Sequence, residues 1–393
     1  MLENKQMLVQ MLDEPTRFLL NIRRYSNALK TSMVFGWRTP TYEDEKMKQL
    51  FDGFSEFAAI NQTGTAALID FFPVLRWLPD FLLPAQKRAK GLFAVEKKLY
   101  TGHWLNAKNC IKEGTPRPCF CVDMARQQDK EGFNDDQAGY ISGTLLEAGS
   151  DTTSSTLHAF IQTMLCFPDV QKKAQEEIDR VVGKDRLLTM DDEPNLQYIR
   201  GCIKETLRWM PTTILGAVPH AGTQDHYYEG YLIPKGAGVL NNVYTIHMDE
   251  NRHPDPRRSD PMRYKDDFQN SSDSAASPDG MKRDHFTFGV GRRICPGMRV
   301  AERSLFLGMS RMLWGFDITP TTGPNGEPVI PNTNLYSQGF VCMPEEFAAV
   351  ITPRSKERAD IVRREWEEAE RELLDPKTKQ WREVPVGMSV SKA

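Results

Sequence analysis

The sequence predicts a mainly helical fold with a small β region. Most of the chain carries apolar residues at the three- and four-residue spacing of amphipathic helices, and the longest such stretch covers residues 134–167. Only residues 220–243 change to short alternating runs separated by turn residues, which is the pattern of strands. With 393 residues, 40% of them hydrophobic, the chain is long enough to bury a large core.

Helical periodicity returns in several separate segments. Helices are predicted within residues 1–60 and at residues 86–100, 134–167, 170–182 and 196–210, with a Pro-rich connecting loop at 71–84 and a surface loop at 270–280. The highly charged residues 354–374 predict a solvated terminal helix, followed by a tail to residue 393. Because no repeat and no break in composition marks a boundary, we expect a single domain over residues 1–393.

Composition excludes several classes of protein. The net charge of -3, from 50 basic and 53 acidic residues, gives no argument for a nucleic-acid partner. The 7 cysteines are unevenly spaced, unlike the disulfide framework of a small secreted domain, so a reducing compartment is expected. The start lacks an apolar core, and charges and prolines interrupt the apolar residues 66–84. We therefore predict no signal peptide, anchor or spanning helix, and a chain that is cytoplasmic or peripherally attached to a membrane.

One cysteine, Cys295, stands just before an amphipathic helix. There its sulfur would face the positive end of the helix dipole, which favours thiolate over thiol. Gly289, Gly291 and Gly297 would let the backbone turn tightly and approach a flat ligand closely. Arg293 could donate a charge-assisted hydrogen bond to a carboxylate of that ligand. The structural alternative is a buried cysteine in a glycine-rich turn.

This segment resembles the haem-binding signature of the cytochrome P450 family, Phe-x-x-Gly-x-Arg-x-Cys-x-Gly. All five fixed positions agree, at Phe288, Gly291, Arg293, Cys295 and Gly297. The resemblance implies that the cofactor is haem b, iron protoporphyrin IX, and that the Cys295 thiolate is the axial ligand of its iron. It also implies that Phe288 packs beside this ligand and that Arg293 holds a haem propionate.

Two further segments resemble motifs of the same family. Glu205 and Arg208 share one helix face and match its Glu-x-x-Arg motif, although such pairs are also common on solvated helices. Residues 260–264 resemble its Pro-x-Arg-Phe segment, whose arginine here is Arg263. The resemblance implies a structural role for the three side chains, which would lock the haem-side core by charge-assisted hydrogen bonds.

In the long central helix, residues 148–153 (Ala-Gly-Ser-Asp-Thr-Thr) resemble the oxygen-binding groove of the family. The resemblance implies that Asp151 and Thr152 deliver protons to dioxygen, and that the helix opens locally because adjacent side chains otherwise diverge. Gly149 costs about 1 kcal/mol relative to alanine in a helix, and a bulky neighbour such as a haem would explain it. The alternative is a polar patch in a buried helix.

His220 follows a Pro-rich stretch that leads into the predicted strands. Family members place a residue that contacts a haem propionate there, and a satisfied structural histidine is the equal alternative. Compared with the family, on the order of a hundred residues would be missing before Met1, including the membrane anchor, the first strands and the first helices. Candidate lining of the substrate pocket remains at residues 71–83, 140–147, 212–218 and 337–340.

The resemblance implies a haem-thiolate monooxygenase that inserts one oxygen atom of O2 into a small organic substrate, similar to filamentous-fungal enzymes of secondary metabolism. Because the segment after Cys295 is too short for a flavin or nicotinamide module, electrons would come from a separate NADPH-cytochrome P450 reductase. A docking patch for it, or simply a solvated face, is formed by Lys282, Arg283, Arg292, Arg299 and Arg303. Family members lie on the endoplasmic reticulum membrane and face the cytosol.

Two alternatives to a monooxygenase remain open. The chain could be a non-catalytic fragment, or a haem-binding protein that cannot close its active site. It could also be a haem-thiolate isomerase or dehydratase, which needs no external electrons. The presence of both Asp151 and Thr152 favours the monooxygenase over the second of these.

Overall fold

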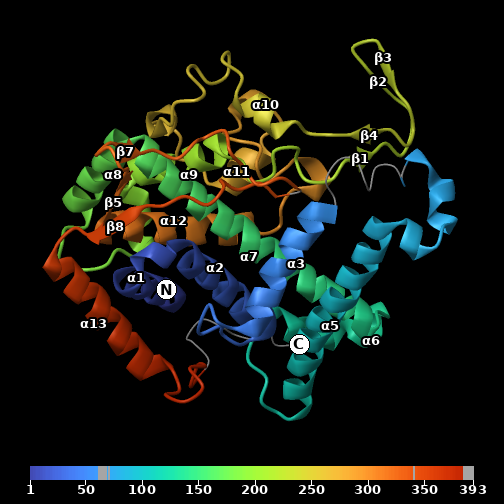
Figure 1. The fold of residues 1–393 in the computed structure, drawn as a ribbon, viewed down its shortest axis with the longest axis horizontal. Helices are drawn as coiled ribbons and strands as arrows, with labels where there is room; N and C mark the ends of the chain where they lie inside the picture. Colours follow the sequence, from blue (N-terminus) through green and yellow to red (C-terminus); the bar gives the residue numbers. More distant parts are fainter. Residues whose placement is uncertain (61–68, 70, 340, 384–393) are drawn as a thin grey trace. The chain divides into compact units, whose positions relative to one another are not determined.

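The computed structural model describes residues 1–60, 69, 71–339 and 341–383. The chain forms two compact units, Met1–Ser154 with Ile351–Ala393, and Ser155–Val350, and each is considered by itself. Helices dominate both units and strands are few and short, which confirms the predicted fold class (Figure 1). The expectation of a single haem domain over residues 1–393 stays a prediction.

The first unit is built from helices. They are α1 (Leu2–Asp13), α2 (Phe18–Phe35), α3 (Glu45–Ile60), α5 (Pro84–Lys112), α6 (Phe120–Glu131), the first part of α7 (Asp135–Cys166) and α13 (Lys356–Leu373), with 3₁₀ turns η1 (Pro15–Arg17), η2 (Pro73–Trp77) and η3 (Asp80–Leu82). In Figure 1, α1 lies between α2 and the red α13, and it packs against both. The long helix α5 packs against α3 and α6.

The second unit combines helices with short strands. Its helices after α7 are α8 (Pro168–Val181), η4 (Met190–Asn195), α9 (Gln197–Trp209), α10 (Val243–His247), η5 (Pro261–Tyr264), α11 (Ser271–Ala276), η6 (Gly280–Lys282), η7 (Gly291–Arg293) and α12 (Met298–Gly315). Its strands are β1 (His220–Ala221), β2 (His226–Tyr228), β3 (Tyr231–Ile233), β4 (Gly238–Val239), β5 (Phe316–Thr319), β6 (Thr321–Thr322) and β7 (Pro328–Val329), and β8 (Val350–Pro353) lies at the boundary. β1 pairs with β4, β2 with β3 and β6 with β7, all antiparallel. The β region predicted at residues 220–243 is thus present.

Small residues on α7 allow other helices of the first unit to approach it. A Cβ at Gly143 would lie 2.2 Å from the ring of Tyr100 in α5, and one at Gly149 would lie 2.5 Å from Cε of Lys30 in α2. A real Cβ cannot approach another atom so closely, so one at Gly143 would clash with the Tyr100 ring, whereas one at Gly149 would require the flexible Lys30 side chain to move. Within the described chain the close neighbour of Gly149 is thus Lys30, and the haem contact expected from the sequence stays a prediction.

The structure also corrects some predicted elements. The helix expected at residues 86–100 extends over Pro84–Lys112, and the Pro-rich segment contains the turns η2 and η3. The expected surface loop at 270–280 contains α11, because the Asn270 side chain caps that helix by accepting from the N–H of Asp273. One face of α13 is buried rather than solvated, and an ion pair between Glu365 and Lys5 of α1 accompanies this packing.

A buried carboxylate organises the start of the chain. Glu3 is 4% exposed and receives Nη1 of Arg24 at 2.6 Å and Nη2 of Arg38 at 3.2 Å, with a further hydrogen bond from Nε of Arg38. Although burial alone would raise the pKa of Glu3, the two guanidinium groups hold that pKa below its ordinary value. The carboxylate thereby ties α1 to α2 and to the segment that follows α2.

Replacing Glu3 with glutamine should destabilise the folded chain by about 3–5 kcal/mol, because it leaves two buried guanidinium groups without a counter-charge. Thermal or denaturant unfolding measures this loss. The matched control is Glu365→Gln, which breaks the more exposed ion pair to Lys5 and should cost below about 1 kcal/mol. If the two substitutions lowered the free energy of unfolding equally, the buried Glu3 cluster would contribute no more to stability than the exposed ion pair.

Candidate active site

Cys295 lies in a turn that leads into α12. Its backbone N–H donates to the carbonyl of Phe288 at 2.9 Å, which closes the turn. Gly289 and Gly291 adopt φ values of 78° and 65°, in the left-handed region that favours glycine. Gly297 is the N-cap of α12, so the cysteine stands just before the N-terminus of that helix, as predicted. This location favours the thiolate form.

The surroundings of this turn fit a flat ligand such as haem. Apart from chain neighbours, no atom of the described residues lies within 4 Å of the place where a Cβ would stand at Gly289 or Gly291. A Cβ at Gly297 would lie 3.7 Å from the sulfur of Cys295, which is an ordinary van der Waals contact. Cys295 and Phe288 are half-buried rather than enclosed in the core. A glycine-lined, open turn beside a half-buried sulfur is what a haem with a cysteine ligand requires.

The two residues predicted to hold haem propionates are exposed. Arg293 belongs to the short turn η7, and within the described part of the chain its guanidinium has no hydrogen-bond partner. His220 lies on β1, opposite Val239 of β4 in the antiparallel register. Both side chains are therefore accessible to a ligand, and a contact with haem stays a prediction.

The structure brings Glu205, Arg208 and Arg263 together around one buried carboxylate. Arg208 forms two hydrogen bonds of 2.7 Å with the carboxylate of Glu205, and Nε of Arg263 lies 3.3 Å from it. The backbone N–H of Asp260 adds a further hydrogen bond at 2.8 Å. Since Glu205 and Arg208 are fully buried, this cluster is not a solvated surface pair.

Asp151 and Thr152 lie in the part of α7 that belongs to the first unit. Asp151 is buried, and burial raises the pKa of its carboxyl to about 6, although the positive charge of Arg23 partly offsets the rise. The hydroxyl of Thr152 donates to the carbonyl of Ala148 at 2.6 Å. The local opening expected here does not appear as a break, because α7 is continuous from Asp135 to Cys166. The result is a carboxyl that can hold a proton near neutral pH, beside a hydroxyl.

Helix α2 fixes the backbone that carries Asp151. The hydroxyl of Ser26 lies 2.7 Å from the carbonyl oxygen of Ser150 and 3.1 Å from that of Gly149. Asn27 donates from its side-chain amide to the hydroxyl of Ser150 at 3.3 Å. These contacts hold α7 against α2 at the residues just before the acid.

A second acid on α7, Glu147, was not among the predicted catalytic residues. Burial, and secondly the charge of Glu96, raise the pKa of Glu147 to about 7, and Tyr100 partly offsets this by hydrogen bonding. Glu147 precedes Asp151 by four residues, so the two carboxyls share one face of the helix. In the sequence, this four-residue spacing of two acids was the signal that could have identified Glu147.

The predicted site residues thus form two sets, one in each compact unit. Asp151 and Thr152 belong to the first unit. The second unit contains the Cys295 turn, His220 and the ionic cluster of Glu205, Arg208 and Arg263. Of the lining positions expected from the sequence, Phe340 lies outside the described residues.

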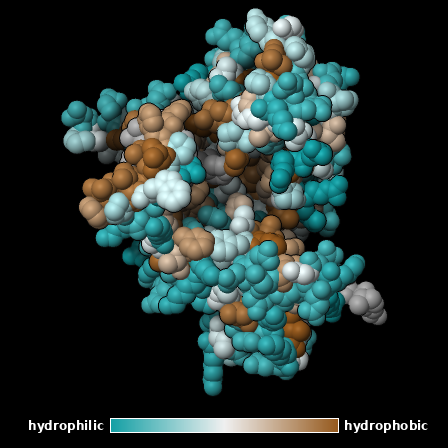
Figure 2. All heavy atoms as spheres, turned by 90° about the vertical axis from the view of Figure 1, so that its right-hand side faces the viewer, coloured by the Kyte–Doolittle hydropathy of each residue, from teal (hydrophilic) through white to brown (hydrophobic). Residues whose placement is uncertain are grey.

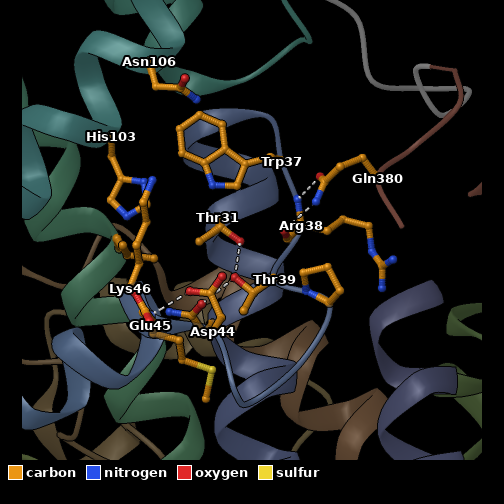
Figure 3. Close-up of a pocket in the computed structure, with 14 residues that line it drawn as sticks. Thr31, Trp37, Arg38, Thr39, Asp44, Glu45, Lys46, His103, Asn106 and Gln380 are labelled. Carbon is orange, nitrogen blue, oxygen red and sulfur yellow. Dashed lines mark hydrogen bonds between the residues drawn. The ribbon is translucent and has the colours of Figure 1, made fainter. Parts of the chain in front are cut away.

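A pocket of about 470 Å³ lies within the first unit. Figure 3 shows His103 of α5 and Trp37 facing it, and their stacked rings have centroids 5.3 Å apart. Thr31 and Thr39, joined by a hydrogen bond of 3.2 Å, form another part of its wall. Of the residues predicted from the sequence, Leu146, in the expected lining segment 140–147, lies in the wall of this pocket, whereas none of the predicted catalytic or haem-holding residues does.

The segment that contains η2 and η3 presents large apolar side chains to solvent. Phe71, Trp77 and Phe81 are more than three-quarters exposed, and hydrophobic residues gather on the face shown in Figure 2. Among the helices of the described residues, none has the length and apolar character needed to cross a membrane.

Comparisons with known proteins agree with this geometry. The family model described as Cytochrome P450 matches residues 8–349. The chain is 50% identical over 388 residues to cytochrome P450 monooxygenase virE of Hypocrea virens, covering 98% of this chain and 70% of that protein. It is 45% identical over 389 residues to cytochrome P450 monooxygenase fsoB of Humicola fuscoatra, with coverages of 98% and 72%.

A solved structure of a zebrafish cytochrome P450 with abiraterone resembles the fold. Its TM-score is 0.68 at 24% sequence identity, and the match covers 90% of this chain and 77% of that one. The helical fold and the cysteine turn before α12 define a protein of the cytochrome P450 type. The chain belongs to the cytochrome P450 family, and it is an oxidoreductase of the monooxygenase class whose family uses a haem cofactor. Enzymes of this family need a redox partner, a substrate and O2.

The raised pKa of Asp151 should make stability depend on pH. The folded chain keeps this carboxyl protonated up to about pH 6, whereas the unfolded chain releases the proton near the ordinary pKa of 3.8. The contribution of Asp151 to the free energy of unfolding should therefore fall as the pH rises between these values, by about 3 kcal/mol in total. Asp151→Asn should remove this fall, as measured by the unfolding midpoint at a series of pH values.

The control for this measurement is Asp136→Asn, which replaces an exposed acid on the same helix. Because Asp136 forms an ion pair with Lys97, its loss can lower the midpoints, but their dependence on pH between 3.8 and 6 should keep the shape found in the unmodified chain. If the Asp151→Asn curve also ran parallel to the unmodified one, burial would not raise the pKa of Asp151.

Proposed function

We propose that the chain is a haem-thiolate monooxygenase that inserts one atom of O2 into a small organic substrate, with Cys295 as the axial ligand of the haem iron. The observation that carries the proposal is the Cys295 turn: a half-buried cysteine just before α12, with open space beside Gly289 and Gly291. Family membership supplies the class of reaction.

The residues of the turn would hold haem b. Arg293 and His220, both exposed, would donate to the propionates, and Phe288 would pack beside the sulfur. Gly291 and Gly297 would let the backbone approach the macrocycle. When bound, thiolate-ligated haem supplies the cleavage of the O–O bond, which the thiolate is known to favour in this family.

Asp151 and Thr152 would supply protons to the reaction. With a pKa of about 6, Asp151 can both take up and release a proton near neutral pH. The hydroxyl of Thr152 is oriented by its hydrogen bond to the carbonyl of Ala148 and can pass a proton on. Glu147, one helical turn earlier and with a pKa of about 7, would resupply Asp151.

The substrate would be a secondary metabolite, in keeping with the resemblance to filamentous-fungal enzymes. The candidate lining of its pocket stays as predicted from the sequence, at residues 71–83, 140–147, 212–218 and 337–340. The exposed apolar side chains of Phe71, Trp77 and Phe81 support a second role for the first of these segments, as a contact with the endoplasmic reticulum membrane on its cytosolic side.

A separate NADPH-cytochrome P450 reductase would supply the electrons. Support comes from a basic surface near the Cys295 turn, where Lys282, Arg292, Arg299 and Arg303 are exposed. Arg283 contributes less, because its guanidinium is bound to the carbonyl of Ser277. Such a surface would steer an acidic partner toward the proximal side of the haem.

Haem loading tests the central claim. The full chain, expressed with haem, reduced and exposed to carbon monoxide, should show the strongly red-shifted Soret band of thiolate-ligated haem. Cys295→Ala should abolish that band, whereas Cys202→Ala, which removes a buried cysteine of α9, should retain it. A chain without this band would instead match the alternative of a fragment or a protein that cannot build the site.

The coupling of electron supply to product tests the proton route. With a fungal reductase and a substrate, Thr152→Val should keep NADPH consumption but divert about tenfold more of it to hydrogen peroxide, because the hydroxyl that passes the proton is lost. The control is Thr163→Val, which replaces a buried threonine with the same hydroxyl-to-carbonyl bond later in α7. Turnover without NADPH would favour an isomerase or dehydratase.

A further inference from the structure

His247 joins the end of α9 to the segment that begins the Cys295 turn. The imidazole is fully buried, and its Nε2 accepts a hydrogen bond of 2.8 Å from the backbone N–H of Phe286. Its Nδ1 lies 3.0 Å from the carbonyl oxygen of Arg208, in the last turn of α9. One side chain therefore forms hydrogen bonds with the backbone of two segments, the N–H of Phe286 and the carbonyl of Arg208.

The two contacts define the protonation of the ring. A backbone N–H can only donate, so Nε2 must carry a lone pair, and a carbonyl can only accept, so Nδ1 must carry the proton. Burial, and secondly the neighbouring His285, hold the pKa of His247 well below its ordinary value. The ring is thus a neutral bridge with a fixed tautomer.

Arg208 holds the bridge in place from the other side. One Nη of its guanidinium donates to the backbone carbonyl of His247 at 2.9 Å, while the rest of the group binds Glu205. Arg208 and His247 thus bond to each other reciprocally, side chain to carbonyl in both directions. The position of the imidazole therefore depends on the buried ionic cluster.

The segment after Phe286 continues directly into the turn. The carbonyl of Phe286 accepts from the N–H of Gly289 at 2.9 Å, and the carbonyl of Phe288 accepts from the N–H of Cys295 at 2.9 Å. The hydroxyl of Thr287 adds a second link to α9, through the carbonyl of Leu207 at 2.7 Å. A displacement of Phe286 would therefore be transmitted to the backbone of Cys295.

We propose that His247 is a positioning residue for the Cys295 thiolate: it holds the backbone at Phe286, and through it the turn that presents the sulfur. This inference rests on the proposed haem-thiolate function, but it concerns a residue outside the haem signature. His247 acts through the hydrogen bond to Phe286 and touches neither haem nor substrate in this role.

Three substitutions of His247 distinguish the effect of its hydrogen bond to Phe286 from that of its hydrogen bond to Arg208. Leucine at position 247 fills the space and loses both bonds. The amide nitrogen of asparagine occupies roughly the place of Nδ1, so His247→Asn keeps the bond to Arg208 but does not reach Phe286. The longer glutamine reaches the place of Nε2 and can again accept from Phe286. His253→Leu is the control, since it removes a nearby buried histidine whose Nε2 has no hydrogen-bond partner among the described residues.

The first readout needs no haem. Hydrogen exchange at the amide of Phe286 should be about tenfold faster in His247→Leu and His247→Asn, the size expected when one buried hydrogen bond is lost. It should return to within about threefold in His247→Gln and stay unchanged in His253→Leu. Circular dichroism confirms that each variant is folded.

The second readout is the ferrous carbon monoxide spectrum of the haem-loaded chain. His247→Leu and His247→Asn should lose the thiolate-type Soret band about tenfold faster on standing, and His247→Gln should rescue it. A purely structural role would give the same result for His247→Asn and His247→Gln, or would slow folding without changing the band. Unchanged exchange at Phe286, or an equally stable band in all variants, overturns the inference.

These outcomes are distinct from failure of the proposed function. If the unmodified chain shows no thiolate band, the proposed function and this inference fall together. If it shows the band and the variants match it, only the role of His247 is lost.

Discussion

The buried carboxylate of Glu205 is the constraint on which the second unit depends. A carboxylate with no solvent exposure is tolerated only when charged or polar donors surround it, and here Arg208, Arg263 and the N–H of Asp260 do so. Arg208 in turn reaches the carbonyls of His247 and of the segment before η5. Satisfying one charge thus fixes α9, α10 and the loops around them into the frame that carries the cysteine turn.

The first unit also contains a buried carboxylate surrounded by guanidinium groups, that of Glu3, but the sequence did not predict this cluster. Glu205 and Arg208 are three residues apart on one helix, so their contact is predictable from helical geometry and from the family motif. The partners of Glu3, Arg24 and Arg38, are separated from it by 21 and 35 residues. No local pattern marks such a pair, because tertiary packing alone brings the groups together.

The helix predictions are likewise accurate where the sequence pattern is local, and they fail where distant residues stabilise the helix. The long periodic segment at residues 134–167 is found as α7 within one residue at each end. The helix α11 was missed, because its Ser-, Asp- and Ala-rich sequence is typical of a loop. It is stabilised by distant acids: Glu302 accepts from the N–H of Ser271 at 2.9 Å, and Asp284 from the hydroxyl of Ser274 at 2.8 Å. Local propensity is overruled where such partners exist.

The central helix shows that a sequence motif does not reveal all the contacts of its own residues. Gly149 belongs to the segment that resembles the oxygen-binding groove, and it also lies close to the side chain of Lys30 in α2. Helix α2 also supplies Ser26, which binds the carbonyl of Ser150, and Arg23, whose charge partly offsets the rise in the pKa of Asp151. A motif therefore identifies the acid, while residues without any motif set the backbone position and the proton affinity of that acid. Substitutions in α2 should then alter proton supply without changing a single residue of the signature.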